Sequence, residues 1–492
     1  MKALLIQPKY PDTFWSFKHA LKFVSKKAAN PPLGLMTVSN LLPAGWEKRL
    51  VDLNISPKLD DEILWADMVF IGAMSVQYES VVKVIEKCKV CDKKIVAGGP
   101  LFTEESEKFD SVDYLVLNEA EITLPHFLAD LENGTPKRIY HSSEFADITK
   151  TPCPDYSLIK PSKYNSMSIQ YSRGCPFNCD FCDITALFGF HVRTKTSTQI
   201  IDELDNILKT GWKGNVFFVD DNFIGNKKIV KTDLLPAVIS WMKKNKMPFN
   251  FTTEASINLA DDEELMRLMV EAGFTKAFIG IETPEELCLE ECKKTQNSKR
   301  DLVDCVKTIQ NYGIEVSAGF IVGFDNDPAN IFQKQIDFIQ KSGIISAMVG
   351  LLTAMPKTRL YKRLHDEGRI LQSSSGDNTD YSLNFIPKMN KDQLLAGYQT
   401  ILTGIYTSKA YYARIHSFLK RFDPPKMARK ISFTDLIPIY KSIFYIGIMK
   451  KNRKYFWKLF FWSLFFKPKT FPLAITYSIF GYHFRKIFGD LK

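Results

Sequence analysis

The chain has 492 residues, of which 45% are hydrophobic and 24% are charged, and its formal net charge is +10 at pH 7. This composition is typical of globular proteins, so it excludes wholesale disorder, collagen and coiled coil, and the length predicts about two to four domains. The nine cysteines exclude a disulfide scaffold, and the first residues lack the apolar core of a signal peptide, so we expect a cytoplasmic protein with reduced thiols.

Short apolar runs alternate with helical patterns over residues 1–145. Apolar strands that alternate with helices indicate a parallel sheet covered on both faces, here a Rossmann-like, doubly wound sheet. Ligands of such sheets bind beyond the carboxyl ends of the strands. The expected strands are Ala3–Gln7, Lys48–Leu53, Met68–Met74, Lys94–Gly98 and Tyr114–Leu117, with helices at Leu33–Leu42 and Tyr78–Cys88.

The first sheet lacks the G-x-G-x-x-G pattern of dinucleotide-binding domains. Gly98-Gly99-Pro100 directly follows a strand, and glycines at that place allow the backbone to approach a bulky ligand closely. Taken alone, the same three residues are equally well explained by a tight turn.

A proline-rich segment, Thr151–Lys163, separates this sheet from a second series, so residues 146–165 are expected to form a linker. Six strands that alternate with helices over residues 166–370 predict a partial (β/α)6 barrel of the TIM type, with its chemistry at the C-terminal strand ends. Residues 371–440 are expected to be mainly helical. The expected barrel strands are Ser166–Tyr171, Asn215–Val219, Asn250–Glu254, Ala277–Ile281, Glu315–Val322 and Ala347–Leu352, and the helices include Thr198–Thr210, Asp262–Ala272 and Lys299–Tyr312.

Three cysteines lie within eight residues directly after the first barrel strand, in Cys175-Pro-Phe-Asn-Cys179-Asp-Phe-Cys182. A structural zinc site needs four ligands, and the next cysteine, Cys153, lies across the proline-rich segment. A 4Fe–4S cluster held by three cysteines leaves one iron open, which is a use for three thiolates that zinc does not share. The pattern therefore favours an iron–sulfur cluster over zinc.

This cysteine motif at the first strand of a β/α barrel resembles the radical S-adenosylmethionine (SAM) superfamily. The resemblance implies that Cys175, Cys179 and Cys182 ligate the cluster and that its open iron binds SAM, which is cleaved to a 5′-deoxyadenosyl radical. Later strand ends resemble the contacts of the family with SAM, although acids there are also common as solvated strand ends. The implied SAM-binding residues are Phe181, Asp220, Asp221, Glu254, Glu282, Gly319, Ile321 and Gly323.

A Rossmann-like domain before such a barrel resembles the cobalamin-binding branch of the superfamily. The matching segments are Asn30–Leu35, Gly72–Tyr78, Gly98–Pro100 and Asn118–Glu121, whose loops surround the corrin in that branch. One departure is that Asp52-Leu-Asn-Ile-Ser-Pro57 stands where some members carry D-x-H-x-x-G, so no histidine is assigned to cobalt. The implied cobalamin-binding residues are Leu33, Gly34, Met74, Ser75, Gly98, Gly99, Pro100 and Glu119.

The usual reaction of this branch is methylation of an unactivated sp3 carbon, with cobalamin carrying the methyl group and with electrons from a donor such as flavodoxin or ferredoxin. The resemblance leaves two alternatives open. One is radical cyclisation, oxidation or carbon–carbon coupling without methyl transfer. The other is a non-catalytic corrin or cluster sensor.

The C-terminal region resembles that of hopanoid methylases and related lipid-modifying members, following Thr353–Tyr361 at the barrel exit. Residues 441–492 hold eleven Lys or Arg, one acid, Asp490, and 16 aromatic residues. Such a segment suits contact with the inner face of a membrane better than nucleic acid, although a docking helix is the alternative. The charges leave no apolar stretch long enough to span a bilayer. The expected lipid contacts are Trp457, Phe460, Phe461, Trp462, Phe465 and Phe466, with Lys450, Lys451, Arg453, Lys454 and Lys458.

The other cysteines form no complete motif. Cys88 and Cys91 have the spacing of a redox pair, but they lie inside a helical pattern, so we expect ordinary thiols. Cys288 and Cys292 share one face of a helix and could hold an auxiliary cluster with Cys305, although only three ligands are present.

Overall fold

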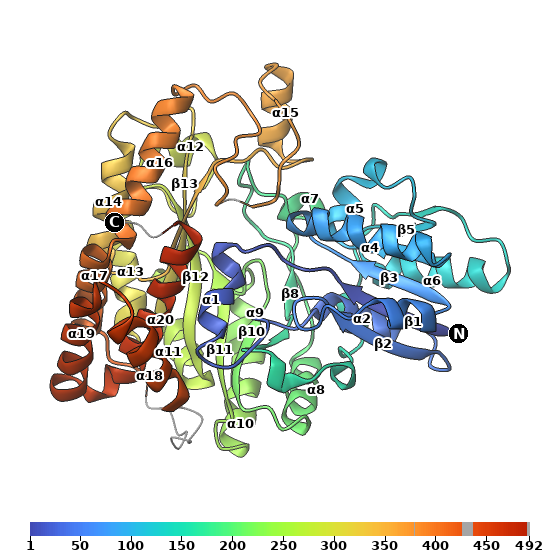
Figure 1. Ribbon diagram of the computed structural model, residues 1–492, viewed down its shortest axis with the longest axis horizontal. Coiled ribbons are helices and arrows are strands. Elements are labelled where there is room, and N and C mark those ends of the chain that lie inside the picture. Colours follow the sequence, from blue (N-terminus) through green and yellow to red (C-terminus); the bar gives the residue numbers. More distant parts are fainter. Residues whose placement is uncertain (378, 426–435, 490–492) are drawn as a thin grey trace.

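The computed structural model describes residues 1–377, 379–425 and 436–489. It contains two six-stranded parallel sheets in sequence order and a helical C-terminal region (Figure 1). The predicted fold class is therefore confirmed.

The first sheet has the strand order β2-β1-β3-β4-β5-β6. The chain leaves β1 in one direction to β2 and continues on the other side with β3, so the strand order reverses between β1 and β3. Its strands are β1 (Lys2–Gln7), β2 (Glu47–Asp52), β3 (Met68–Gly72), β4 (Lys94–Gly98), β5 (Tyr114–Val116) and β6 (Ile139–Tyr140). Its helices include α2 (Leu33–Leu41), α4 (Tyr78–Val90), α5 (Pro100–Glu104) and α6 (Ala120–Glu132).

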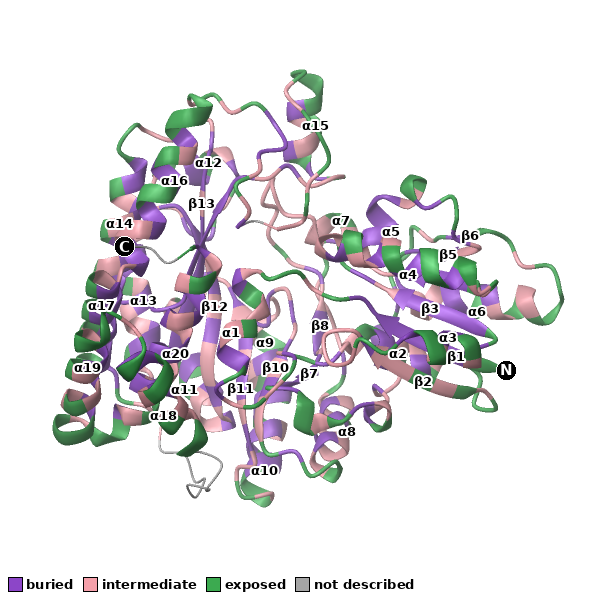
Figure 2. Cartoon of the chain, viewed as in Figure 1, coloured by how far each residue is buried: buried purple, intermediate pink, exposed green. Residues whose placement is uncertain are grey.

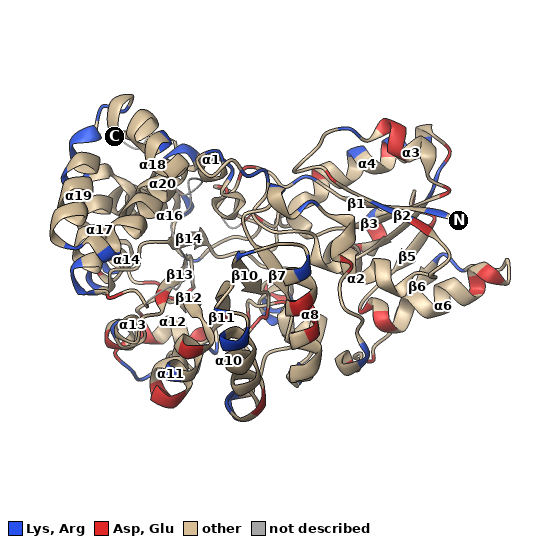
Figure 3. Cartoon of the chain, turned by 90° about the horizontal axis from the view of Figure 1, so that it is seen from below, with Lys and Arg blue, Asp and Glu red and all other residues tan. Residues whose placement is uncertain are grey.

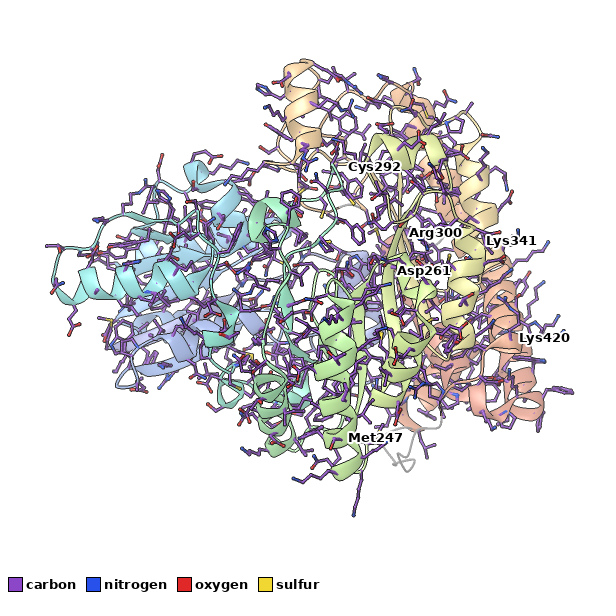
Figure 4. All side chains as sticks on the ribbon, turned by 180° about the vertical axis from the view of Figure 1, so that it is seen from behind. Met247, Asp261, Cys292, Arg300, Lys341 and Lys420 are labelled. Atoms are coloured by element: carbon purple, nitrogen blue, oxygen red, sulfur yellow. The ribbon has the colours of Figure 1, made fainter. Side chains whose placement is uncertain are left out.

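The second sheet has the order β14-β13-β12-β11-β10-β7, so it forms an open barrel whose outer strands are β7 and β14. Met247, just before β11, and Cys292, beyond β12, lie at opposite ends of this sheet in Figure 4, so the carboxyl ends point upward there. Its strands are β7 (Met167–Ile169), β10 (Gly214–Phe218), β11 (Phe249–Ala255), β12 (Phe274–Glu282), β13 (Glu315–Val322) and β14 (Ala347–Leu351). The outer helices include α8 (Ser197–Lys209), α10 (Leu235–Lys244), α11 (Glu263–Ala272), α12 (Glu286–Glu291), α13 (Leu302–Asn311) and α14 (Ile331–Ser342).

Three features differ from the sequence-based expectations. The strands β6, β8 (Ser172–Arg173) and β9 (Arg193–Thr194) were not expected, because two residues are too short to show a periodic pattern. The segment expected to be a linker, residues 146–165, contains three short 3-10 helices that the sequence did not indicate, and its Tyr164 hydroxyl donates to Asp52 at 3.1 Å. The helices after the barrel begin only at Lys391, because the run Ser373–Asp377 favours turns.

The C-terminal helices divide into a buried and an exposed part (Figure 2). Helix α20 (Phe471–Ile487) packs against α1 (Lys18–Leu21) and the residues before it, with the Phe484 ring stacked on Phe14 at 4.3 Å. Helix α19 (Arg453–Phe466) contacts α17 (Ser408–Arg421) but leaves much of its aromatic surface exposed. The other helices of this region are α15 (Arg359–Asp366), α16 (Lys391–Tyr406) and α18 (Leu436–Ser442).

Parts of two predicted regions, 426–435 of the helical region and 490–492 of the basic tail, lie outside the described residues. Among the described helices, none combines the length and the hydropathy needed to cross a membrane.

Candidate active site

The cysteine motif forms a loop between β8 and α7 (Ile184–Phe188), at the carboxyl edge of the second sheet. The turn into this loop requires Gly174, whose φ is +89°. A Cβ at this position would lie 2.9 Å from the carbonyl oxygens of Gly189 and His191, so a larger residue would displace the returning strand. The sequence therefore fixes the start of the loop one residue before Cys175.

The three thiols suit a cluster better than a single metal ion. Each is partly accessible, and burial raises the pKa of Cys175 and Cys179 in the absence of a metal. Cys153, the possible fourth zinc ligand, lies elsewhere and accepts a hydrogen bond from Asn206 at 3.4 Å. In the part of the chain that the structure describes, no three His, Cys, Asp or Glu side chains surround one metal position. Three soft thiolates without a fourth ligand fit a cluster with one open iron.

Asp220, which follows β10, holds the root of the cysteine loop. Its buried carboxylate accepts hydrogen bonds from the Ser172 backbone amide, from the Ser172 hydroxyl at 2.6 Å and from the Tyr171 amide at 3.3 Å. Burial raises the pKa of Asp220 to about 7, against the effect of these donors. Asp220 is therefore largely engaged in fixing the loop.

Asp221 and Glu254 are less engaged and lie close to each other at the ends of β10 and β11. Asp221 accepts a long hydrogen bond, 3.4 Å, from the Gly174 amide. Burial raises the pKa of Asp221 to about 6, and burial together with Asp221 and Asp220 raises the pKa of Glu254 to about 8. Within the described residues, neither Asp221 nor Glu254 forms an ion pair with Lys or Arg. A cationic ligand would relieve this crowding of carboxyl groups.

Glu282 ends β12 in a strained conformation, with φ at +63°, where the register with β13 shifts. Its carboxylate pairs with Lys294, whose Nζ lies 2.6 Å from Oε1. Lys294 was not expected from the sequence, because one lysine beside another after a short helix carries no recognisable signal. The pair is nearly buried, with 9% and 12% of the two side chains exposed.

The end of β13 lies next to Glu282. The Gln335 amide donates to the carbonyl oxygens of Glu282 and Ile321, both at 3.1 Å, and so joins the ends of β12 and β13. Gly323 has φ at +109°, and its amide donates to Asp327 at 2.6 Å. Gly319 faces Phe278, which would lie 3.0 Å from an added Cβ. The two glycines thus let neighbouring side chains, such as Phe278 at Gly319 and Leu394 at Gly323, approach the strand closely.

The predicted corrin loops lie together at the carboxyl edge of the first sheet. Gly98 and Gly99 end β4, and a Cβ at Gly98 would lie 2.6 Å from the Val116 carbonyl oxygen. Gly34, near the start of α2, faces open space, and Met74, after β3, is 51% exposed. The remaining predicted residues of this edge are Leu33, at the start of α2, Ser75, whose hydroxyl donates to Glu104, and Pro100, the first residue of α5.

Glu119, also predicted to contact the corrin, lies in an ionic network between the two sheets. It pairs with Arg173 at 2.8 Å and with Arg193 at 2.8 Å, and it accepts from the Ala146 amide. Arg173 also binds Glu121 at 2.7 Å. Because Arg173 is two residues before Cys175, the network ties the β5 edge of the first sheet to the cysteine loop.

A second contact joins the two edges. Glu104 of α5 lies against Asp183, the residue after Cys182, and burial together with this neighbouring carboxyl raises the pKa of Glu104 to about 7. Lys357, from the loop before α15, donates to the Thr103 carbonyl oxygen at 2.5 Å. The loops predicted to border a corrin therefore lie next to the cysteine loop.

The remaining cysteines do not all gather in one place. Cys88 is fully buried in the core of the first sheet. Cys288 donates to Asp327 at 3.3 Å, while Cys305 lies near Arg300, which pairs with Asp261 at 2.9 Å. Cys288 and Cys292 lie in one buried apolar cluster, and the carbonyl oxygen of Cys292 accepts a hydrogen bond from the Asp180 amide of the cysteine loop at 3.0 Å, whereas Cys305 lies apart from them.

Comparison with known proteins agrees with this geometry. A model of the radical SAM superfamily matches residues 169–367, and a domain of unknown function, DUF4070, matches residues 358–492. The chain is 39% identical over 490 residues to an uncharacterized methyltransferase of Synechocystis sp., covering 98% of this chain and 91% of the relative. It is 35% identical over 470 residues to the hopanoid C-2 methylase of Rhodopseudomonas palustris, covering 93% and 88%.

Two solved structures share the fold. The cobalamin-dependent SAM radical enzyme OxsB, with aqua-cobalamin and SAM bound, has a TM-score of 0.64 at 14% identity, over 100% of this chain and 79% of that one. The radical SAM methyltransferase TsrM from Kitasatospora setae, with cobalamin and a [4Fe-4S] cluster bound, has a TM-score of 0.61 at 12% identity, over 97% and 99%. The chain belongs to the radical SAM superfamily and is an enzyme. The two sequence relatives given above are named as a methyltransferase and a methylase.

Proposed function

We propose that this enzyme is a cobalamin-dependent radical SAM methyltransferase that methylates an unactivated sp3 carbon of a hydrophobic lipid, such as a polycyclic terpenoid. The observation that carries the proposal is the junction of the two sheet edges through Arg173 and Glu119. Glycine-rich loops of the first sheet and the cysteine loop of the second then border one space. In this proposal the first domain, residues 1–145, binds cobalamin, and the barrel, residues 166–370, binds SAM. Residues 146–165 connect the two. The helical domain comprises residues 371–440, and the basic, aromatic tail comprises residues 441–492.

Cys175, Cys179 and Cys182 would hold the cluster, which supplies the electron that cleaves SAM, received from a donor such as flavodoxin or ferredoxin. Asp220 and Gly174 keep the loop in place through the hydrogen bonds and the turn described above. Phe181, between the second and third cysteines, packs on Phe324 at 6.3 Å and shields this edge from water.

The carboxyl groups would receive SAM. Asp221 and Glu254 are the candidates for its ammonium group, since they are half-buried, lie close together and form no ion pair with Lys or Arg among the described residues. Glu282, at the end of β12, is a candidate to accept hydrogen bonds from the ribose hydroxyls, and Gly319, Ile321 and Gly323 at the end of β13 would lie beside the adenine ring.

Cobalamin would carry the methyl group, held at the β3, β4 and β5 ends of the first sheet. Gly98 and Gly99 allow the corrin to approach the backbone, and Met74, Ser75, Leu33, Gly34 and Pro100 border the same edge. Glu119 would support the cobalamin site indirectly, by fixing the end of β5 to the cysteine loop, since Arg173 and Arg193 already bind its carboxylate. Asp52 is bound by Tyr164 and Asn54, and the lower face of cobalt stays without an assigned ligand.

Product analysis tests the reaction class. Reconstituted enzyme with SAM, cobalamin and a lipid extract should yield both 5′-deoxyadenosine and S-adenosylhomocysteine. 5′-Deoxyadenosine without S-adenosylhomocysteine would indicate a radical reaction without methyl transfer, and neither product would indicate a sensor. Lipids from cells with and without the gene should differ by the mass of one methylene group.

We also propose that the enzyme binds the surface of an anionic membrane through α18 and α19. On α19, Phe461, Phe465 and Phe466 are 49%, 71% and 78% exposed. Lys and Arg lie along this end of the molecule, whereas Asp and Glu gather on elements such as α3, α8 and α11 (Figure 3). Three of the expected contacts are half-buried instead, since Trp457 donates to Gly447, Trp462 packs on His416 and Phe460 packs on Phe471.

Vesicle sedimentation tests the membrane proposal. The Phe465→Ser/Phe466→Ser variant should bind vesicles of anionic phospholipid several-fold more weakly than the wild type, because two large apolar groups no longer insert. Val90→Ser is the matched control, since Val90 is 88% exposed on the first domain. Equal binding by all three proteins would leave α19 as a docking helix only.

A further inference from the structure

The turn after α12, Lys293–Asn297, borders the cysteine loop of the proposed cluster site. Lys293 pairs with Asp180 at 3.1 Å, and the Gln296 amide donates to the Cys179 sulfur at 3.7 Å. The Asn297 amide donates to the carbonyl oxygens of Gly280 and Ile281 at 3.0 and 2.9 Å, which fixes the turn to β12. We call this segment the α12 turn. Its polar groups therefore have defined positions beside the loop.

Lys294 is the more buried of the two cations that the α12 turn places beside the loop. Its Nζ lies 5.8 Å from the centre of the Phe181 ring, between Cys179 and Cys182 in the sequence, and 2.6 Å from Glu282 Oε1. A Cβ at Gly280 would lie 2.6 Å from this Nζ and 2.5 Å from the same carboxylate oxygen. Glycine at this position therefore makes room for the ion pair.

Both charges of the ion pair lie close enough to the cysteine loop to act on it. Lys294 interacts electrostatically with Cys175, Cys179 and Cys182, and Glu282 interacts with Cys179. Only 12% of the Lys294 side chain and 9% of the Glu282 side chain are exposed, so the ammonium group is held in a poorly solvated site beside the loop. A fixed positive charge in a poorly solvated site stabilises any added negative charge nearby.

We propose that Lys294, positioned by Glu282 and Gly280, raises the reduction potential of the cluster held by Cys175, Cys179 and Cys182. Reduction adds one electron from an external donor and thus one negative charge to the cluster, and the ammonium group stabilises that charge. The hydrogen bond from Gln296 to Cys179 acts in the same direction. This inference rests on the proposed function, because it needs the cluster to be present.

The test is a redox titration of reconstituted protein without SAM. The electron paramagnetic resonance signal of the reduced cluster monitors the titration. Lys294→Met should shift the midpoint potential to a more negative value, because the charge is lost while the length is nearly kept. Lys294→Arg should keep the wild-type potential. Lys293→Met, which removes a 53% exposed cation one residue away, should shift it less.

Two further variants separate the effects of the two charges of the ion pair. Glu282→Gln keeps Lys294 and should shift the midpoint potential to a more positive value. This variant tests the inference even if Lys294→Met does not assemble a cluster. Lys294→Met/Glu282→Gln should shift the potential downward, but less than Lys294→Met alone. Wild-type protein without an iron–sulfur signal would overturn the proposed function, whereas wild-type potential in both single variants with full iron content would overturn only this inference.

Discussion

The two sheets have the same number of parallel strands, yet a pair of acidic side chains at the carboxyl edge of one has different partners from a pair at the carboxyl edge of the other. In the first sheet, Glu119 and Glu121 are neutralised by arginine. Burial acts to raise the pKa of Glu121, but Arg173 outweighs it and holds that pKa below its usual value. In the second sheet, Asp221 and Glu254 lie together and their pKa values are raised.

This difference separates a structural use of carboxylates from a ligand-binding one. A buried carboxylate with a guanidinium partner is already satisfied and gains little from a ligand. Buried carboxyl groups that crowd one another are destabilised when ionised, and a cationic ligand removes that cost. The first edge therefore offers backbone and open space to a bulky ligand, while the second offers charge to SAM.

The largest expected effect is on the cysteine loop. Cys179→Ala should abolish 5′-deoxyadenosine formation and lower the iron content, because one of three cluster ligands is lost. Cobalamin binding should persist, since it depends on the other sheet. Cys305→Ala is the matched control and should retain iron and cleavage. Mass spectrometry of the nucleoside product and absorption of bound cobalamin measure the two properties, and undiminished cleavage in Cys179→Ala would remove the cluster assignment.

Arg173→Ala should lower the free energy of unfolding by about 3–5 kcal/mol, because it leaves Glu121 and part of Glu119 as buried, unpaired charges. Urea titration of the protein without cofactors measures this loss. Arg49→Ala is the control: Arg49 pairs with Glu62 at the surface, 45% exposed, so its loss should cost about 0–1 kcal/mol. Equal losses in the two variants would mean that the network does not join the sheets.

The carboxyl edge of the second sheet predicts that the stability of the protein without SAM falls as the pH rises. The pKa of Glu254 is about 8 in the folded protein, above its unfolded value of 4.5, so the folded state binds the proton more tightly. The contribution of Glu254 to stability is therefore complete below pH 4.5 and decreases as the pH rises toward 8. Glu254→Gln should remove roughly 3 kcal/mol of the stability that the wild type loses between pH 5 and pH 8 in the absence of SAM.

Urea titrations at pH 5, 6, 7 and 8 measure the slope. Saturating SAM should reduce the slope in the wild type, because its ammonium group favours the ionised carboxylates. Glu121→Gln is the control from the first sheet. Its wild-type carboxyl has a lowered pKa, so its stabilising contribution is already present throughout this pH range. An identical slope in wild type and Glu254→Gln would contradict the assignment of Glu254.

The sequence predicted the strands well where the apolar pattern was long. The bounds of β4 and β13 match the expected ones, because each is a continuous buried run. The hairpin β8–β9 was missed, although it carries Arg173 and Arg193 of the network, since a two-residue strand has no period. Local pattern thus predicts the sheets but not the connections that bring their edges together.

The sequence indicated which types of residue form the site, but it indicated the role of each residue only in part. Asp220 and Asp221 were equivalent in the sequence, and only the hydrogen bonds from Ser172 separate them. Lys294 was missed because its position depends on the space at Gly280 and on the strained end of β12. The basic, aromatic tail is similar in composition along its length, so the sequence did not distinguish the buried helix α20 from the exposed helix α19.

The smallest expected effect concerns the first edge. Gly98→Ala places a Cβ 2.6 Å from the Val116 carbonyl oxygen, so β4 and β5 must move apart, at a cost of about 1–3 kcal/mol in stability. Because the shift occurs under the proposed corrin, cobalamin affinity should decrease while the iron content stays at the wild-type level. Gly45→Ala, in open space in the same domain, should change neither property. Wild-type cobalamin affinity in a destabilised Gly98→Ala protein would place the corrin away from β4.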